Sequence, residues 1–140
     1  MKLKIKLLHA SAKIPKYAHE SDACFDLVAT APAQVWGGVT VIGTGIAVDV
    51  PEGFALMVYG RSGMGSKGIT LANCVGVVDP GYHGEVKVML KASTITPYHI
   101  DAGDRIAQAM LIERPTVEFE QVTELEHSQR GEGGFGSTGA

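Results

Sequence analysis

The chain has 140 residues, which is the size of one domain with a substantial core. Its hydrophobic content of 45% is typical of a soluble globular protein, and its 19% of charged residues leaves a net charge of -3. This balance argues against a general nucleic-acid or membrane binder, without excluding a local basic site. No apolar run is long enough to cross a bilayer. We therefore expect a soluble, intracellular (cytoplasmic) protein.

Two cysteines, Cys24 and Cys74, and five scattered histidines offer neither a disulfide framework nor the spacing of a zinc site. We interpret each cysteine as a small buried hydrophobe rather than a reactive thiol. The 18 glycines predict numerous turns, and places where the backbone comes close to a ligand.

Short strands are expected along most of the chain, because alternating or compact apolar runs recur between turn residues and no segment has a helical period. Gly43 and Gly45 interrupt one long strand at a bend or bulge. The fold class is predicted to be all-β, a jelly roll or distorted β-barrel. The expected strands cover residues 2–7, 21–29, 39–50, 54–59, 71–78, 86–91, 105–112 and 116–122, and the expected loops or turns cover 14–20, 32–38, 51–53, 96–97 and 101–104.

The stretch from Gly76 to Glu85 stands between two apolar runs. Pro80 presets the second position of a turn and Gly81 tolerates a positive φ at the third. Residues 79–82 are therefore predicted to form a type II turn at the tip of a hairpin, with Asp79 before the bend and Tyr82 after it. The acid could orient a water and the ring could stack on a cyclic ligand. Taken alone, the stretch is better explained as an ordinary turn whose acid caps a backbone amide.

Residues 60–69 have the chemistry of an anion cradle. Their glycines free backbone amides, and Arg61, Ser62, Ser66 and Lys67 supply donors. The spacing approaches that of a P-loop, but Ser66 and Lys67 stand in the inverted order and no crossover helix follows, so that assignment is rejected. Taken alone, the segment is better explained as a flexible loop with an exposed arginine.

Three other features are weaker signals. Asp26 lies among apolar neighbours, where it either accepts backbone amides or faces a cation or its waters. Gln108 is polar inside a strand, which usually means that it points outward. The glycine-rich tail, residues 130–140, is either a disordered end or a mobile flap that orders over a ligand.

Five segments together resemble the trimeric dUTPase family, in the same order and over nearly the whole chain. Each is weak by itself, whereas the ordered set is specific. The segments are Ala-Cys-Phe-Asp-Leu at 23–27, Gly-Arg-Ser-Gly at 60–63, Gly-Val-Val-Asp-Pro-Gly-Tyr-His-Gly-Glu at 76–85, Gly-Asp-Arg-Ile-Ala-Gln at 103–108, and the tail from Arg130 to Gly139.

The resemblance implies a homotrimer of jelly-roll subunits, with three sites at subunit interfaces that each take residues from more than one chain. It implies a β-barrel part over residues 1–125 and a mobile C-terminal flap over 126–140. The reaction would be hydrolysis of dUTP to dUMP and pyrophosphate, with Mg²⁺ held mainly by the triphosphate. Such an activity limits uracil incorporation into DNA and supplies dUMP for dTMP synthesis.

The resemblance also assigns roles. Asp79 would orient and deprotonate the water that attacks the α-phosphorus. Tyr82 would pack on the deoxyribose and exclude a 2′-hydroxyl, while the hairpin backbone, including Val78, would pair with uracil beside Asn73. Asp26 would reach Mg²⁺ through water. The remaining roles concern phosphate and the closing tail: Arg61, Ser62, Gly63 and Gln108 on phosphate, Phe135 stacked on uracil, and Arg130, Gly136, Ser137 and Thr138 around the terminal phosphates.

The chain departs from the family pattern at three places: Gly81 where many members have a second acid, a segment 62–69 that looks one residue shorter, and Cys24-Phe25 in place of Gly-Tyr. Two other functions stay open. One is a dCTP deaminase-like relative on the same fold, which must activate water at the base. The other is a nucleotide-dependent regulatory binding protein, whose partner protein is not readable from the sequence.

Overall fold

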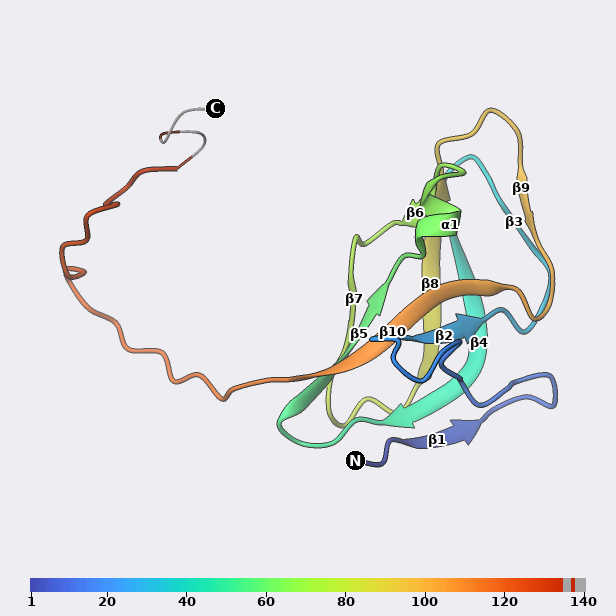
Figure 1. Cartoon of the computed structure of the whole chain (residues 1–140), viewed down its shortest axis with the longest axis horizontal. Coiled ribbons are helices and arrows are strands. Elements are labelled where there is room, and N and C mark those ends of the chain that lie inside the picture. Colours follow the sequence, from blue (N-terminus) through green and yellow to red (C-terminus); the bar gives the residue numbers. More distant parts are fainter. Residues whose placement is uncertain (135–136, 138–140) are drawn as a thin grey trace.

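The computed structural model describes residues 1–134 and 137, and over this range it is almost entirely β-structure (Figure 1). Two four-stranded sheets and one two-stranded sheet form the body, with a single turn of helix, α1 (Ser62–Gly65). The first sheet has the order β1 (Lys4–Leu7), β4 (Val39–Asp49), β8 (Glu85–Ala92), β6 (Ile69–Leu71). The second has the order β2 (Phe25–Val28), β10 (Arg105–Glu113), β5 (Phe54–Tyr59), β7 (Gly76–Val78), and the third pairs β3 (Ala33–Val35) with β9 (Tyr98–Ile100).

The core joins side chains from both large sheets. Strand β8 shows how one face of a sheet contributes to this core. Val86, Val88 and Leu90 are buried, while Lys87 and Lys91, which alternate with them, are exposed. Leu27 of β2 and Leu56 of β5 belong to the same buried cluster. Burial of such side chains is the main stabilising term of the fold. The prediction of an all-β fold is confirmed, although no closed barrel is formed by the described residues.

The long strand β4 carries the predicted irregularity. Its pairing with β8 shifts register between Gly43 and Ala47, which marks a β-bulge. Gly45 lies in the bulge with φ of 67°, in the left-handed region that favours glycine. A Cβ at this position would lie 2.6 Å from Thr30 Cγ2 and 2.7 Å from Ala12 Cβ. The chain therefore needs glycine here for two independent reasons.

We expect Gly45→Ala to lower the free energy of unfolding by about 2–4 kcal/mol, because backbone strain and overpacking add at one site. Denaturant unfolding measures the change. Gly53→Ala is the matched control, since Gly53 also has a positive φ of 79° but nothing within 4 Å of the added Cβ. An equal loss in both variants would contradict the packing part of the argument.

The predicted turn at residues 79–82 is confirmed, but the predicted hairpin is wrong. Tyr82 N–H donates to the Asp79 carbonyl over 3.3 Å, and Gly81 has the positive φ of 82° that a type II turn requires. However, β7 pairs with β5 and β8 pairs with β4, so the turn connects the two sheets instead of joining neighbouring strands. We call residues 79–82 the Asp79 turn.

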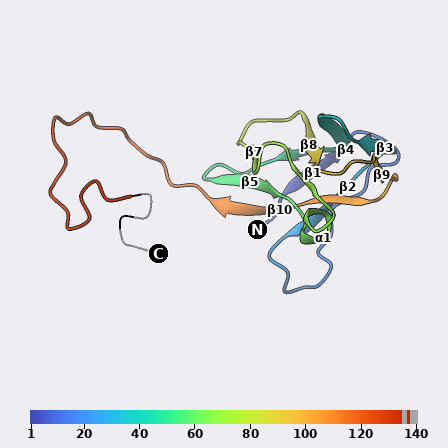
Figure 2. The same cartoon turned by 90° about the horizontal axis from the view of Figure 1, so that it is seen from above.

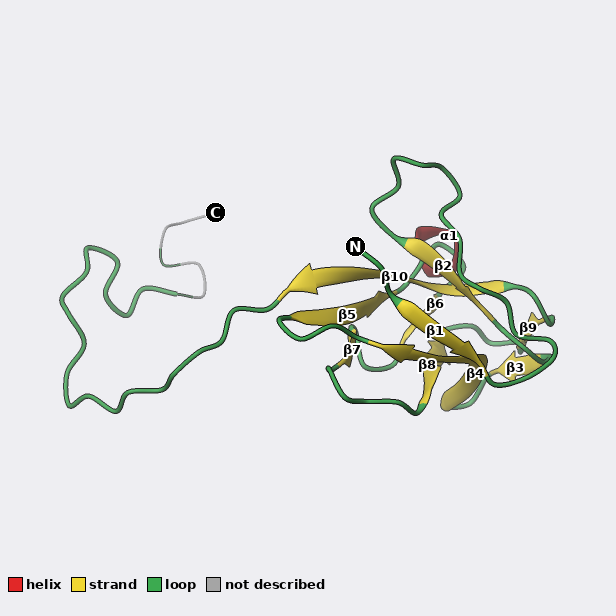
Figure 3. Ribbon diagram, turned by 90° about the horizontal axis from the view of Figure 1, so that it is seen from below, coloured by secondary structure: helices red, strands yellow, loops and turns green. Residues whose placement is uncertain are grey.

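The predicted strand over residues 116–122 is also wrong. Arg114 N–H still donates to the Gly53 carbonyl over 2.7 Å, and from Pro115 the chain leads away from the sheets (Figure 1, Figure 2 and Figure 3). Phe119 is 93% exposed and Val117 60% exposed. The alternating pattern suits a strand, but no strand of this chain pairs with the segment over its described residues.

The strand expected over 71–78 is wrong in its middle, because β6 ends at Leu71, β7 begins at Gly76 and the chain turns over residues 72–75. Three small elements were not predicted. The loop expected at 32–38 contains β3, which pairs with β9 through Val35 and Tyr98. The cradle expected at 60–69 begins with the one turn of α1. No helix among the described residues is long and apolar enough to cross a membrane.

Candidate functional site

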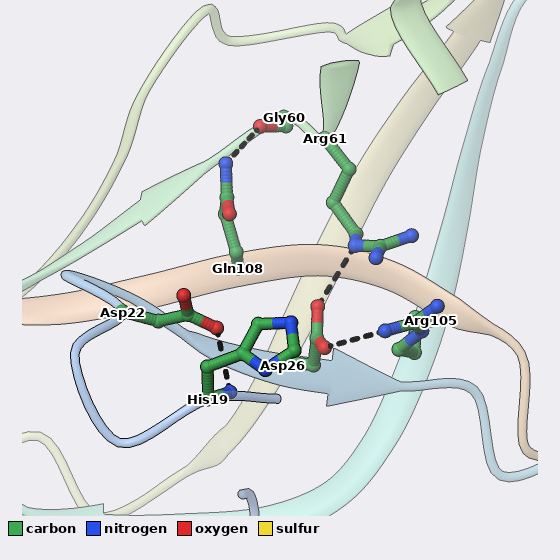
Figure 4. Close-up of polar contacts among 7 residues, drawn as sticks. All are labelled: His19, Asp22, Asp26, Gly60, Arg61, Arg105 and Gln108. Atoms are coloured by element: carbon green, nitrogen blue, oxygen red, sulfur yellow. Dashed lines mark hydrogen bonds and ion pairs between the residues drawn. The ribbon is translucent and has the colours of Figure 1, made fainter. Parts of the chain in front are cut away.

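Strand β10 brings three of the recognised segments side by side. Gln108, in the middle of β10, lies opposite Asp26 of β2 on one edge and opposite Tyr59 of β5 on the other. Its side-chain Nε2 donates to the Gly60 carbonyl over 2.9 Å (Figure 4). Gln108 thus fixes the point where β5 leaves the sheet, one residue before Arg61.

Asp26 pairs with two arginines from different segments (Figure 4). Arg61 Nε donates to Asp26 Oδ1 over 2.8 Å, and Arg105 donates to Oδ2 over 3.2 Å. The side chains of Asp26 and Arg61 are 16% and 23% exposed, so this pair is screened by water less than a surface pair. One carboxylate therefore positions two guanidinium groups.

The two arginines border a cavity of about 390 Å³ whose other charged groups are Lys67 and Asp104. Three cations against one lining carboxylate give it a positive balance, and Asp26 neutralises part of that charge from beneath. Gly63 lies on the same cavity, and its neighbour Ser62 begins α1 as an exposed residue. Guanidinium groups and free backbone N–H groups bind phosphate oxygens well.

The residues around Asp26 fit a metal ion only through water. No group of three His, Cys, Asp or Glu side chains lies together among the described residues, so they offer no protein cage. Each Asp26 oxygen already accepts one arginine hydrogen bond. A carboxylate has about four lone-pair sites, which leaves room for a water of a hydrated Mg²⁺ ion.

A second set of predicted residues gathers around the Asp79 turn. Asn73, Val78, Asp79 and Tyr82 line one groove of about 330 Å³. Asp79 and Asn73 are exposed, and Tyr82 is 49% exposed. The groove lies against the β7 edge of its sheet, which offers backbone donors and acceptors to a flat ring.

The two sets lie apart within one chain. Val78 pairs with Leu56 near the start of β5, whereas Arg61 follows the end of that strand. The five residue steps from Leu56 to Arg61 span about 17 Å for an extended chain, at about 3.3 Å per residue. Asp79 and Arg61 therefore lie at different ends of β5 within one chain.

Among the described tail residues, Arg130 and Ser137 join neither set in this chain. Arg130 Nε donates to the Gly133 carbonyl over 2.9 Å, and Ser137 N–H donates to the Gly134 carbonyl over 3.0 Å, so both make local contacts. The predicted residues Phe135, Gly136 and Thr138 lie outside the described residues.

Sequence reasoning missed Arg105 as a member of the site. Only the pairing of β10 with β2 brings Arg105, at the start of β10, to Asp26. The Nζ of Lys67, one of the donors expected in the cradle, lies 5.7 Å from the Tyr98 ring centre at the edge of the cavity.

Burial, and then the negative charge of Asp26, raises the pKa of the Cys24 thiol. Cys24 is only half-buried and Cys74 is exposed, so the prediction that both cysteines are buried hydrophobes is wrong.

Comparison with known proteins gives one consistent answer. A sequence model of the family described as dUTPase matches residues 10–139. The deoxyuridine 5'-triphosphate nucleotidohydrolase of Clostridium tetani is 41% identical, over 98% of this chain and 96% of the relative. That of Thermobifida fusca is 40% identical, over 99% of this chain and 79% of the relative.

Solved structures agree with the sequence relatives. A mutant dUTPase of Staphylococcus bacteriophage 80alpha with dUpNHpp has a TM-score of 0.92 and 30% identity, and the match covers 99% of both chains. A mutant dUTPase from phage phi11 of S. aureus, reported with a structural Mg(II) ion, has a TM-score of 0.83 and 27% identity, over 91% of this chain and all of that chain. With sequence and structure in agreement over nearly its full length, the chain belongs to the dUTPase family.

Proposed function

We propose that this protein hydrolyses dUTP to dUMP and pyrophosphate, with water attacking the α-phosphorus. The observation that carries the proposal is the pairing of a groove bearing Asp79 and Tyr82 with a positive cavity bearing Arg61, in a chain of the dUTPase family. The 80alpha neighbour contains dUpNHpp, a dUTP analogue, which supports dUTP as the ligand.

Asp79 acts as the general base in this mechanism. It is exposed at the end of β7, so its carboxylate is free to take a proton from a water. Tyr82 stands three residues further on and packs on the sugar, where a 2′-hydroxyl would collide with the ring. Backbone groups from Val75 to Val78, with Asn73 beside them, pair with uracil, and cytosine would present the opposite donors and acceptors.

The positive cavity holds the triphosphate. Arg61, Ser62, Gly63 and Gln108 contact its oxygens, and Asp26 keeps Arg61 in place. A bound Mg²⁺ would supply charge neutralisation on the triphosphate, and Asp26 would hold it by accepting a hydrogen bond from its water shell. The phi11 relative, reported with a structural Mg(II) ion, supports magnesium binding in this family. Positioning and charge neutralisation then supply most of the rate acceleration.

A homotrimer completes the site, since Val78, next to Asp79, pairs with Leu56, which lies about 17 Å before Arg61 along an extended chain. The groove of one subunit meets the cavity of its neighbour, and a cyclic arrangement repeats this contact three times. Residues 1–125 form the scaffold. Residues 126–140 act as a flap, with Phe135 over uracil and with Arg130, Gly136, Ser137 and Thr138 around the terminal phosphates.

Product analysis tests the proposed reaction. Purified protein is incubated with Mg²⁺ and dUTP, dCTP, dTTP or UTP, and pyrophosphate, nucleoside monophosphates and ammonia are followed. We expect pyrophosphate and dUMP from dUTP alone. Ammonia from dCTP would instead identify a deaminase, and binding of dUTP without any product would identify a regulatory nucleotide-binding protein.

The Asp26 contact gives a separate prediction. We expect Asp26→Asn to lower kcat/KM for dUTP by about 10–100-fold, because the arginines lose the charge that positions them. The half-saturating Mg²⁺ concentration should rise as well. Steady-state kinetics over a Mg²⁺ series measures both, with Asp101→Asn as the control at an exposed acid. An unchanged Mg²⁺ dependence with full activity would remove Asp26 from the mechanism.

A further inference from the structure

The ring of Tyr82 folds back over its own segment. A Cβ built on Gly84 would lie 2.5 Å from the Tyr82 hydroxyl oxygen, 2.6 Å from Cζ and 3.0 Å from Cε2. These are the three nearest atoms to that point, and all belong to the one ring. The phenol therefore occupies the space that any side chain at position 84 would need.

The need for glycine at position 84 comes from the ring and not from the backbone. Gly81 has a positive φ, but Gly84 is outside the left-handed region. Alanine could adopt the backbone conformation of Gly84 without strain. Because Gly84 has no side chain, the Tyr82 ring can lie against the backbone at position 84.

The hydroxyl end of the same ring is held by the next residue. Tyr82 Oη donates to the Glu85 carbonyl over 3.1 Å. The Glu85 carboxylate, in turn, accepts the Gly45 N–H over 2.9 Å and lies 3.6 Å from Lys87 Nζ. Its side chain is only 17% exposed. Glu85 therefore ties the segment that carries Tyr82 to the bulge in β4.

We propose that Gly84 and Glu85 are positioning residues for Tyr82, and that together they set the selectivity of the enzyme for deoxyribose over ribose triphosphates. This inference rests on the proposed function. Gly84 supplies the space for the ring, and Glu85 fixes both the phenol hydroxyl and the backbone beneath it. The ring is thereby held in place by its own chain before any nucleotide binds, which reduces the ordering cost of binding.

A double-mutant cycle tests the role of Gly84. The variants are Gly84→Ala, Tyr82→Ala and the double variant, and the measurement is kcat/KM for dUTP and for UTP. We expect Gly84→Ala alone to lower the dUTP-to-UTP ratio by about tenfold or more, since ångström-scale displacements of a positioned group have effects of this size. In the Tyr82→Ala background, the same substitution should change the ratio less than about twofold.

The outcomes separate clearly. An equal effect of Gly84→Ala in both backgrounds would show a general disturbance of the turn and overturn the inference. An unchanged ratio in the background that keeps Tyr82 would overturn it as well. Absence of dUTP hydrolysis by the unmodified protein would instead contradict the proposed function. The unmodified protein is therefore assayed before any variant.

Glu85 is tested through its side-chain acceptor. Glu85→Gln keeps an oxygen that can accept the Gly45 N–H, whereas Glu85→Ala removes it. We expect Glu85→Ala to reduce the dUTP-to-UTP ratio and Glu85→Gln to restore most of it. Thermal melting of both variants accompanies the kinetics. A loss of stability with an unchanged ratio would assign Glu85 a structural role only and overturn its part of the inference.

Discussion

Asp79→Asn should lower kcat for dUTP by about 10³-fold, within the range that general-base catalysis supplies, while leaving dUTP affinity nearly unchanged. The amide keeps the size of the carboxylate but cannot take the proton of the attacking water. Asp79 is exposed, so the change should not unfold the turn. Single-turnover kinetics gives the chemical rate, and equilibrium titration with dUpNHpp gives the affinity. Glu52→Gln, at an exposed acid that lines neither the groove nor the cavity, is the control.

The same variant tests how subunits share the site. Asp79→Asn and Arg61→Ala chains should each be nearly inactive alone. Co-assembled from equal amounts, they should regain about a quarter of wild-type activity. A site is intact only when an Arg61→Ala chain supplies Asp79 and an Asp79→Asn chain supplies Arg61, and each of these has a probability of one half. No recovery in a verified mixed trimer would place both residues in one subunit's site. Full activity of Asp79→Asn would remove it as the base.

Removal of residues 130–140 should lower kcat/KM for dUTP by about 10²-fold and leave a folded trimer. A closing flap orients the substrate and excludes water, so its loss affects catalysis more than folding. The described tail residues contact only their own segment, so the body loses none of its described contacts. Kinetics measures the loss, and sedimentation shows whether the truncated chains still form the proposed trimer.

Removal of Ala140 alone is the control for the truncation, and Phe135→Ala in the full chain tests the proposed stacking by itself. An unchanged rate after removal of residues 130–140 would exclude a flap. Dissociation of the trimer would instead give the tail a structural role.

The sequence pattern was sufficient where the residues within a strand by themselves indicate its bounds. Residues 54–59 and 105–113 were predicted nearly to the residue, because their apolar runs end at turn-forming residues. The sequence pattern failed where the formation of a strand depends on the neighbouring strand that it pairs with. The alternating segment 116–122 has no strand to pair with, and three-residue β3 and β9 exist only through each other. Which sheet β7 joins is likewise a tertiary choice that the turn after it does not encode.

The site likewise has one part that local sequence predicts and one part that depends on tertiary contacts. Gly81 and Pro80 have local backbone preferences, so the geometry of the Asp79 turn could be predicted from four residues. The contact of Asp26 with Arg61 and Arg105 joins residues 35 and 79 positions apart. Only the register of β10 against its two neighbours brings them together, and no local pattern contains that register.

The separation of Asp79 from Arg61 within one chain has a consequence for enzyme concentration. If neither half works alone, an isolated chain has no turnover, and mass action governs how much enzyme exists. Specific activity should then fall on dilution once trimers dissociate, and excess dUTP should protect against this loss by binding across the contact. When most chains are dissociated, the concentration of active enzyme therefore rises more steeply than in direct proportion to the chain concentration.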